Sequence, residues 1–295
     1  ERLGHTTCCI APNRYPYFLE WMTDIGHIGV FKEDHDGAMA RFIGEADVIF
    51  CMDFNQINRL DRVTDTVTAN TTAVRVLIDH HLHPPVDGYA VQFSDTHACS
   101  TSYIVYQLLE ALAGTDAIDQ AMAESLYVGI MTDTGNFSFS SLTSDLFRAV
   151  AVLIDKGVNV PYVNSSVYNN FSEGRMRLLG YMLNDKMVTD YEFGVAYVSL
   201  TEEEMRRFDF IQGDSEGFVN YPLSIRGIRM SAMFIQTKHS IRVSLRSRGE
   251  VDVNVFARRY FDGGGHRNAA GGKSYVPMNE TLENFRKYLR EYFGA

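Results

Sequence analysis

The chain has 295 residues, a length that suits about two domains, and its 45% hydrophobic and 22% charged residues are typical of a soluble globular protein. No apolar run reaches the roughly 20 residues that span a bilayer, and the start does not resemble a signal peptide. The net charge of −10 would repel long nucleic acid, so any nucleotide ligand is expected to be small or short and held in a pocket.

The first half alternates β-prone and helical segments. Continuous apolar runs, which indicate parallel strands buried on both faces, cover 6–10, 46–52 and 74–78. Helical patterns cover 16–22, 101–113, 117–130 and 146–154. Ser100 or Thr101 is the expected cap of the helix at 101–113, and Gly114 is its expected stop. Strands that alternate with helices predict a parallel α/β sheet.

The second half has a different character. Polar helical sequence is followed by strand signals at 193–200, 228–235 and 240–245 and by helical patterns at 251–261 and 282–293. We therefore expect a first domain over 1–154, connector helices over 155–186 and a second, smaller α/β domain over 187–295.

Four cysteines occur without a Cys-x-x-Cys pair: Cys8, Cys9, Cys51 and Cys99. All but Cys99 lie in apolar, strand-like runs. We expect buried thiols in a reducing cytoplasm, and neither disulfides nor zinc ligands.

Acidic and histidine residues stand where apolar segments end. Asp53 follows the run 46–52, Asp79-His80-His81 follows the next run, and Asp133 follows a helix. In a parallel sheet, ligands gather beyond the carboxyl ends of the strands. Carboxylates with imidazoles suit Mn²⁺ or Mg²⁺, which polarise phosphoryl oxygens and lower the pKa of a bound water. Each residue alone also fits a helix cap or turn, and the clusters gain weight because they share one edge.

A glycine-rich motif lies near the C-terminus, Gly263-Gly264-Gly265-His266 followed by Ala269-Ala270. Glycines let backbone N–H groups approach an anion, and the two alanines are expected to start a helix whose N-terminus favours negative charge. Arg246, at the end of a β run, can bind a phosphate with two hydrogen bonds. A flexible turn and a solvated arginine are the simpler alternatives.

In this order the motifs resemble those of the DHH phosphoesterases, and the C-terminal part is similar to the DHH-associated domain. The bacterial nanoRNase and pAp phosphatase group is the most similar branch. The resemblance covers essentially the whole chain and implies an active-site cleft between two domains. It also implies residue roles. The metal ligands, for a pair of Mn²⁺ ions or alternatively Mg²⁺, would be Asp53, His80 and Asp133. The catalytic residues would be Asp79, His81 and His266. The residues that bind the substrate phosphates would be Arg246, Ser247, Gly264, Gly265 and His266.

One family motif has no counterpart, the His-x-x-x-Asp-x-Asp pattern that ends the first strand. The first acidic residue after Glu1 is Glu20, within helical sequence. We expect roughly fifty residues upstream, the length of a βα unit, and an incomplete metal site in the chain as given.

The resemblance implies a hydrolase of short oligoribonucleotides, linear dinucleotides such as pApA, or pAp, with no long duplex and no membrane as partner. Exposed sheet edges make a homodimer reasonable. Two alternatives stay open: an inorganic polyphosphatase, and a catalytically silent nucleotide-binding module.

Overall fold

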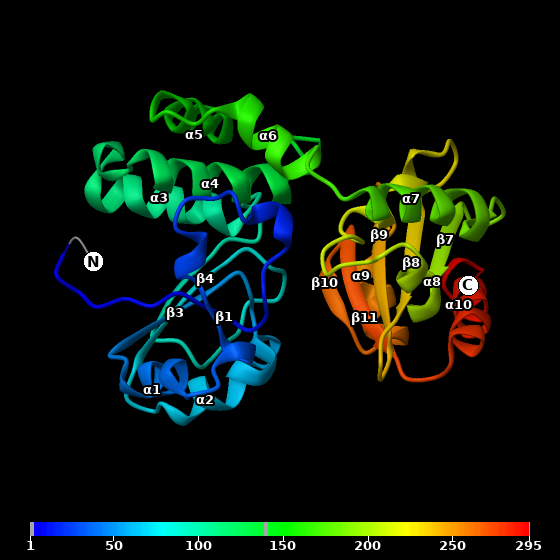
Figure 1. Ribbon diagram of the computed structural model, residues 1–295, viewed down its shortest axis with the longest axis horizontal. Coiled ribbons are helices and arrows are strands. Elements are labelled where there is room, and N and C mark those ends of the chain that lie inside the picture. The colour runs from blue at the N-terminus through cyan, green and yellow to red at the C-terminus, as the bar shows by residue number, and fades with distance from the viewer. Residues whose placement is uncertain (1–2, 139–140, 295) are drawn as a thin grey trace. The chain divides into compact units, whose positions relative to one another are not determined.

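The chain divides into two units between Asn170 and Phe171, each with its own sheet and core (Figure 1). The division falls inside the segment 155–186 that the sequence predicts as a connector. Helix α6 (Val160–Tyr168) belongs to the first unit and helix α7 (Glu173–Tyr181) to the second. The computed structural model describes residues 3–138 and 141–294.

The main sheet of the first unit is parallel, as the continuous apolar runs predict. Its strands, in spatial order, are β3 (Val48–Met52), β4 (Val74–Asp79) and β5 (Val91–Ser94). Leu77, at the centre of β4, is fully buried. A separate short parallel pair is formed by β1 (Ile10–Ala11) and β2 (Gly29–Val30).

Helices cover both faces of this sheet (Figure 1). On one face, Val76 and Ile78 pack against helix α3; on the other, Ile49 packs against the short helices α1 and α2. The α-helices are α1 (Ala38–Glu45), α2 (Thr64–Ala69), α3 (Thr101–Ala113), α4 (Gln120–Asp133) and α5 (Ser144–Asp155). Short 3₁₀ turns are η1 (Tyr17–Leu19), η2 (Ile25–His27), η3 (Phe31–Glu33), η4 (Ile57–Val63) and η5 (Thr115–Ala117).

The prediction of buried thiols is half wrong. Cys51, in β3, and Cys99 are buried, whereas Cys8 and Cys9 are exposed. The physical reason is that the predicted strand at 6–10 pairs only from Ile10 onward, so the residues before it lie outside the sheet.

The second unit holds a mixed sheet of six strands in the order β10-β11-β9-β8-β7-β6. Only β7 and β8 run parallel; the other neighbours are antiparallel. The strands are β6 (Val188–Asp190), β7 (Val195–Leu200), β8 (Met230–Gln236), β9 (Ile241–Ser247), β10 (Gly264–His266) and β11 (Ala269–Ser274).

Two apolar clusters cover the two faces of this sheet. One packs Phe234 and Leu245 against helices α9 (Val253–Tyr260) and α10 (Met278–Phe293). The other packs Met233 against α7, η7 (Phe218–Ser224), the π-helical turn η6 (Met182–Lys186) and α8 (Glu202–Arg207). Among the helices within the described residues, none has the length and apolar character that crossing a membrane requires.

The expected helix at Ala269-Ala270 is wrong, because both residues lie in strand β11. This strand sits between β9 and β10, and Ala270 is buried against the same core as Phe234. The glycine motif is therefore one arm of a β-hairpin, and its anion chemistry cannot come from a helix N-terminus.

A capping box fixes the start of α8. Glu204 accepts hydrogen bonds from the backbone and hydroxyl of Thr201, and its other oxygen accepts from the Tyr181 hydroxyl and the Lys186 ammonium. Burial alone would raise the pKa of Glu204, but these hydrogen bonds outweigh it and lower the pKa to about 2.

We expect Glu204→Gln to destabilise the protein by about 1 kcal/mol at neutral pH, because hydrogen bonds to a charged group are lost while the capping geometry is kept. The folded-state pKa is lowered, so the contribution of the carboxylate is fully present above the ordinary value of 4.5 and is lost as the pH falls toward about 2. Thermal unfolding from neutral pH down to about pH 3 should show parent and variant converging. Glu203→Gln, on an exposed side chain of the same helix, should show neither effect.

Candidate active site

The carboxyl ends of β3 and β4 lie level with one another. Met52 pairs with Ile78, and the backbone N–H of Asp53 donates to the Ile78 carbonyl over 3.0 Å. Asp53 has a φ of 64°, a left-handed conformation that turns the chain sharply away from the strand. The side chains that follow the two strands therefore meet at one edge of the sheet, as the sequence predicts.

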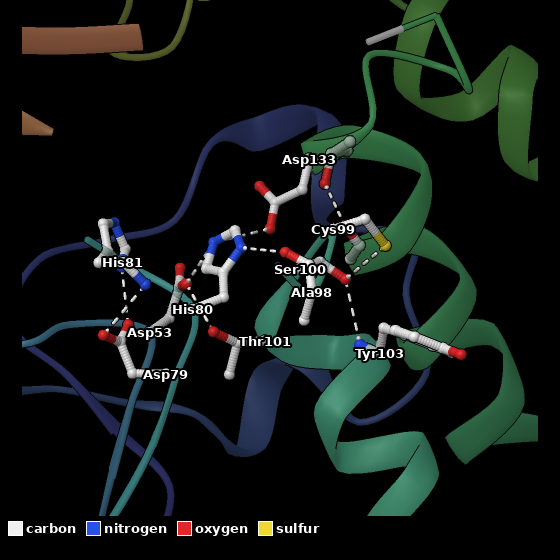
Figure 2. A network of polar contacts seen from close by, with 12 residues as sticks. Asp53, Asp79, His80, His81, Ala98, Cys99, Ser100, Thr101, Tyr103 and Asp133 are labelled. Atoms are coloured by element: carbon white, nitrogen blue, oxygen red, sulfur yellow. Dashed lines mark hydrogen bonds and ion pairs between the residues drawn. The ribbon is translucent and has the colours of Figure 1, made fainter. Parts of the chain in front are cut away.

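His80 is held in one orientation with one nitrogen facing the carboxylates (Figure 2). Its Nδ1 lies 3.2 Å from the Ala98 carbonyl, which can only accept, so we assign the proton to Nδ1. Its Nε2 lies 3.6 Å from Asp53 Oδ1 and 3.7 Å from Asp133 Oδ2. His80 is 8% exposed, and with its proton on Nδ1 the imidazole could bind a metal ion through Nε2.

His81 is oriented in the same way by Asp79 (Figure 2). Its Nδ1 lies 2.7 Å from Asp79 Oδ1, and its backbone N–H donates to Oδ2 over 3.2 Å. Asp79 is fully buried; burial alone would raise its pKa, but the hydrogen bonds and charge of His81 outweigh that and lower it. Both carboxylate oxygens thus serve His81, whose Nε2 points away from Asp79.

Asp133 closes the site from the C-terminal end of α4. Burial raises the pKa of its carboxyl to about 6, and the negative charge of Asp53 adds to the effect. The carboxylates of Asp53 and Asp133 repel each other, and a divalent cation between them would relieve that repulsion.

Within the first unit, the donor atoms fall into two overlapping groups. Asp53, His80 and Asp133 form one, and Asp53, Asp79 and His81 form the other; within each group the donor atoms lie within 4.8 Å of one another. Oxygen and imidazole donors of this kind fit Mn²⁺ or Mg²⁺. Asp53 belongs to both groups.

Sequence reasoning missed two residues that support this edge. Thr101 donates its hydroxyl to Asp53 Oδ1 over 2.9 Å, while the neighbouring Ser100 alone caps α3 by accepting from Tyr103 N–H. Asn55 is buried and donates to the carbonyls of Leu82 and His83, which ties the loop after β3 to the loop after β4. The signal in the sequence for Thr101 was the pair of hydroxyl residues at the start of a helix. One hydroxyl is enough to cap a helix, so the second is available for another contact.

In the second unit, paired positions on adjacent strands form a row across one face of the sheet. Ser231 on β8 pairs with Arg246 on β9, Arg246 pairs with Ala269 on β11, and Ala269 pairs with His266 on β10. Directly paired residues point to the same face. The sheet therefore brings the predicted phosphate-binding residues Arg246 and His266 to one face, separated by one small side chain.

The glycines of the hairpin serve close packing of its strands. A Cβ at Gly263 would lie 2.0 Å from the Gly271 carbonyl oxygen, and one at Gly265 would lie 2.5 Å from the Ala269 oxygen. The Gly265 N–H donates to the Asn254 side chain over 3.0 Å. The close approach of the neighbouring backbone thus explains why these positions are glycine. The Gly265 amide already has a hydrogen-bond partner within the protein.

Ser247, which the resemblance predicts to bind substrate phosphates, points to the face opposite Arg246, because the side chains of neighbouring residues in a strand point to alternate faces. It is buried, donates to the Val251 carbonyl over 2.6 Å and accepts from the Asn268 side chain over 2.8 Å. These contacts tie the end of β9 to the hairpin turn. Gly264 lies beside Asn254 and Arg258 on α9.

Comparison with known proteins is consistent with these motifs. Residues 4–130 match the N-terminal domain of the DHH family, and residues 191–295 match the DHHA1 domain. The bifunctional oligoribonuclease and PAP phosphatase NrnA of Bacillus subtilis is 30% identical over 251 residues, which cover 83% of this chain and 73% of that protein. A protein of Streptococcus mutans, described as a probable bifunctional oligoribonuclease and PAP phosphatase NrnA, is 27% identical over 92% of this chain and 81% of its own length.

Among solved structures, an exopolyphosphatase-related protein from Bacteroides fragilis is 38% identical, with a TM-score of 0.89 over 97% of this chain and 83% of that one. The likeness extends over both units and supports the α/β fold assigned to each. Since both domains match in order, and since the Bacillus relative shares this identity over most of both chains, the chain belongs to the DHH family of phosphoesterases and is a hydrolase that acts on phosphoester bonds.

Proposed function

We propose that the protein is a Mn²⁺-dependent phosphoesterase that cleaves short oligoribonucleotides and linear dinucleotides such as pApA, and that it also removes a phosphate from pAp. The observation that carries the proposal is the edge shared by β3 and β4, where Asp53 belongs to two donor groups and both His80 and His81 present Nε2. Mg²⁺ is the alternative ion. The substrates are taken from the relatives named oligoribonuclease and PAP phosphatase.

Each residue has a separate task in this proposal. Asp53, His80 and Asp133 hold the metal, which when bound polarises a phosphoryl oxygen and lowers the pKa of a water. Asp79 keeps the proton of His81 on Nδ1, so that Nε2 faces the scissile phosphate.

The second unit would bind the rest of the substrate. Arg246 supplies a planar set of N–H donors that matches a phosphate, and His266 follows it in the same row of the sheet. Over residues 226–273, which include this row, Arg and Lys outnumber Asp and Glu, although the chain as a whole is acidic. Positive charge concentrated in one segment of an acidic protein suits a short anionic substrate, whereas the acidic remainder of the chain disfavours a long duplex.

Hydrolysis of a labelled RNA dinucleotide, pApA and pAp by the full chain with Mn²⁺ or Mg²⁺ tests the proposal. We expect cleavage that requires the metal and stops when a chelator is added. A chain that binds these compounds and leaves all of them intact would be a nucleotide-binding module instead, and the claim of catalysis would be wrong.

An inorganic polyphosphatase is the second candidate, because the same donor set can serve phosphoanhydrides and a structural relative is described as exopolyphosphatase-related. The two candidate functions differ in whether the substrate must carry a nucleobase. A nucleotide hydrolase should cleave pApA far faster than tripolyphosphate at equal concentration, whereas the reverse order would favour the polyphosphatase.

The proposal includes a cytoplasmic location and a homodimer. The expectation of a homodimer rests on exposed sheet edges, of which β3 is one within the described residues. Light scattering on the purified chain would give the oligomeric state.

A further inference from the structure

A buried hydroxyl in the second unit is left without a hydrogen-bond partner. Ser231, in the middle of the sheet on β8, is fully buried, and its Oγ has no partner within the described residues. On one side its paired neighbour is Ala196, which packs with Leu223 and Ile228. An unpaired buried hydroxyl lowers stability, so its presence calls for a physical reason.

The neighbour of Ser231 on its other side is Arg246. The two residues are directly paired in the antiparallel register of β8 and β9, a position that places Cβ atoms about 5 Å apart on one face. Arg246 is half-buried, and burial lowers the pKa of its guanidinium although the nearby charge of Glu216 opposes this. Within the described part of the chain, the guanidinium makes a single hydrogen bond, from Nη1 to the carbonyl of the preceding Leu245.

The two groups are chemically complementary. A guanidinium has five N–H donors and no acceptor, and a hydroxyl oxygen has two lone pairs. A phosphate held by two parallel hydrogen bonds uses one edge of the guanidinium and leaves donors on the other edges. Ser231 is the side chain placed to accept from one of these, because the other paired neighbour of Arg246 is Ala269, which has no polar side chain.

We propose that Ser231 is a positioning residue, whose hydroxyl accepts a hydrogen bond from the Arg246 guanidinium when the guanidinium holds a substrate phosphate. The inference rests on the proposed function, in which Arg246 binds that phosphate. It explains why a polar side chain persists among apolar neighbours: the hydroxyl gains its partner only in the bound state. Ser231 itself, being fully buried, would not touch the substrate.

Ser231→Ala separates this role from a structural one, because the two roles move stability in opposite directions. Removing a hydroxyl that has no partner in the unbound protein should leave the melting temperature unchanged or raise it. KM for pApA should rise about tenfold, the equivalent of about 1.4 kcal/mol for one hydrogen bond to a charged group, with kcat within about twofold of the parent. A hydroxyl with a structural partner would instead lower the melting temperature when removed.

Two further variants make the comparison specific. Ser199→Ala changes a serine on the neighbouring strand β7 that lies on the opposite face, and it should leave KM unchanged. Arg246→Ala should raise KM by more than Ser231→Ala does. If Ser231 acts through Arg246, adding Ser231→Ala to Arg246→Ala should not raise KM further.

The outcomes distinguish the two proposals. If Arg246→Ala raises KM while Ser231→Ala leaves it unchanged, or if Ser231→Ala lowers the melting temperature, the inference about Ser231 is wrong and the proposal that Arg246 binds the phosphate stands. If Arg246→Ala has no effect on KM, both phosphate binding by Arg246 and the role of Ser231 are wrong. Calorimetric binding of pApA gives the same comparison should the parent not cleave it, and a parent that neither cleaves nor binds pApA would overturn both proposals.

Discussion

Replacing His80 with Asn should reduce kcat/KM for pApA by about a thousandfold or more, and should weaken Mn²⁺ binding in parallel. Mutation of a residue that merely orients a metal ligand already costs about 10–100-fold, and His80 is placed as a ligand itself. Asn can still donate to the Ala98 carbonyl, as Nδ1 of His80 does, but it has no atom at the position of Nε2. The substitution therefore removes the donor between Asp53 and Asp133 and keeps the local support.

The comparison needs a control for general damage to the fold. His97→Asn serves, because His97 is also a histidine of the first unit, its side chain is 96% exposed and its contact is with the exposed Asp95. It should leave kcat/KM and metal affinity unchanged. Calorimetric titration with Mn²⁺ and steady-state kinetics measure both quantities, and a thermal melt shows whether His80→Asn remains folded.

A His80→Asn variant that binds Mn²⁺ as tightly as the parent would contradict the assignment of this residue. It would shift the expected ligand set to the second donor group, in which Asp53 is joined by Asp79 and His81. A loss of metal affinity without a loss of cleavage would place the reaction elsewhere in the chain.

Strands β3 and β4 were predictable because apolar residues dominate the segments 46–52 and 74–78 in which they lie. The expectation of burial on both faces is right only in part, since Val48, Phe50 and Met52 of β3 are exposed. Once the sheet is known to be parallel, the polar residues that follow each strand must share one edge. Asp53 and His80 could be grouped from sequence for that reason alone.

Residues whose position depends on pairing between distant segments were not predictable. The pair Ala269-Ala270 is compatible with a helix by composition, and only its place between β9 and β10 makes it a strand. Ser231 stands in an apolar run and gives no signal until the register sets it opposite Arg246. Thr101 and Asn55 likewise act on partners that are far away in the sequence.

Asp79→Asn should lower kcat/KM by about a hundredfold while changing the shape of the site very little. The substitution keeps the size of a fully buried side chain and removes its charge. The carboxylate now accepts both from His81 Nδ1 and from the His81 backbone N–H; an amide offers one acceptor and one donor for these two partners. One contact is lost whichever way the amide turns, and the proton of His81 is no longer fixed on Nδ1.

The size of the effect follows from what depends on that proton. A neutral imidazole with its proton on Nε2 has no lone pair there, so it can neither bind a cation through this atom nor accept a proton. Loss of an orienting partner typically costs about 10–100-fold, and we expect the upper end because Asp79 makes two contacts with His81. Some loss of stability, about 1–3 kcal/mol, should accompany it, since a hydrogen bond to a buried charged group disappears.

A double-mutant cycle decides whether Asp79 works only through His81. If it does, Asp79→Asn should have little further effect on kcat/KM in a His81→Ala background, because the residue that it orients is already gone. If the two losses multiply, Asp79 must act independently of His81, and its place beside Asp53 in the second donor group would make direct metal ligation the natural explanation. The same cycle measured on Mn²⁺ affinity separates the two cases a second time. In the His81→Ala background, Asp79→Asn should leave the affinity unchanged if Asp79 only orients His81, and should lower it further if Asp79 is itself a ligand.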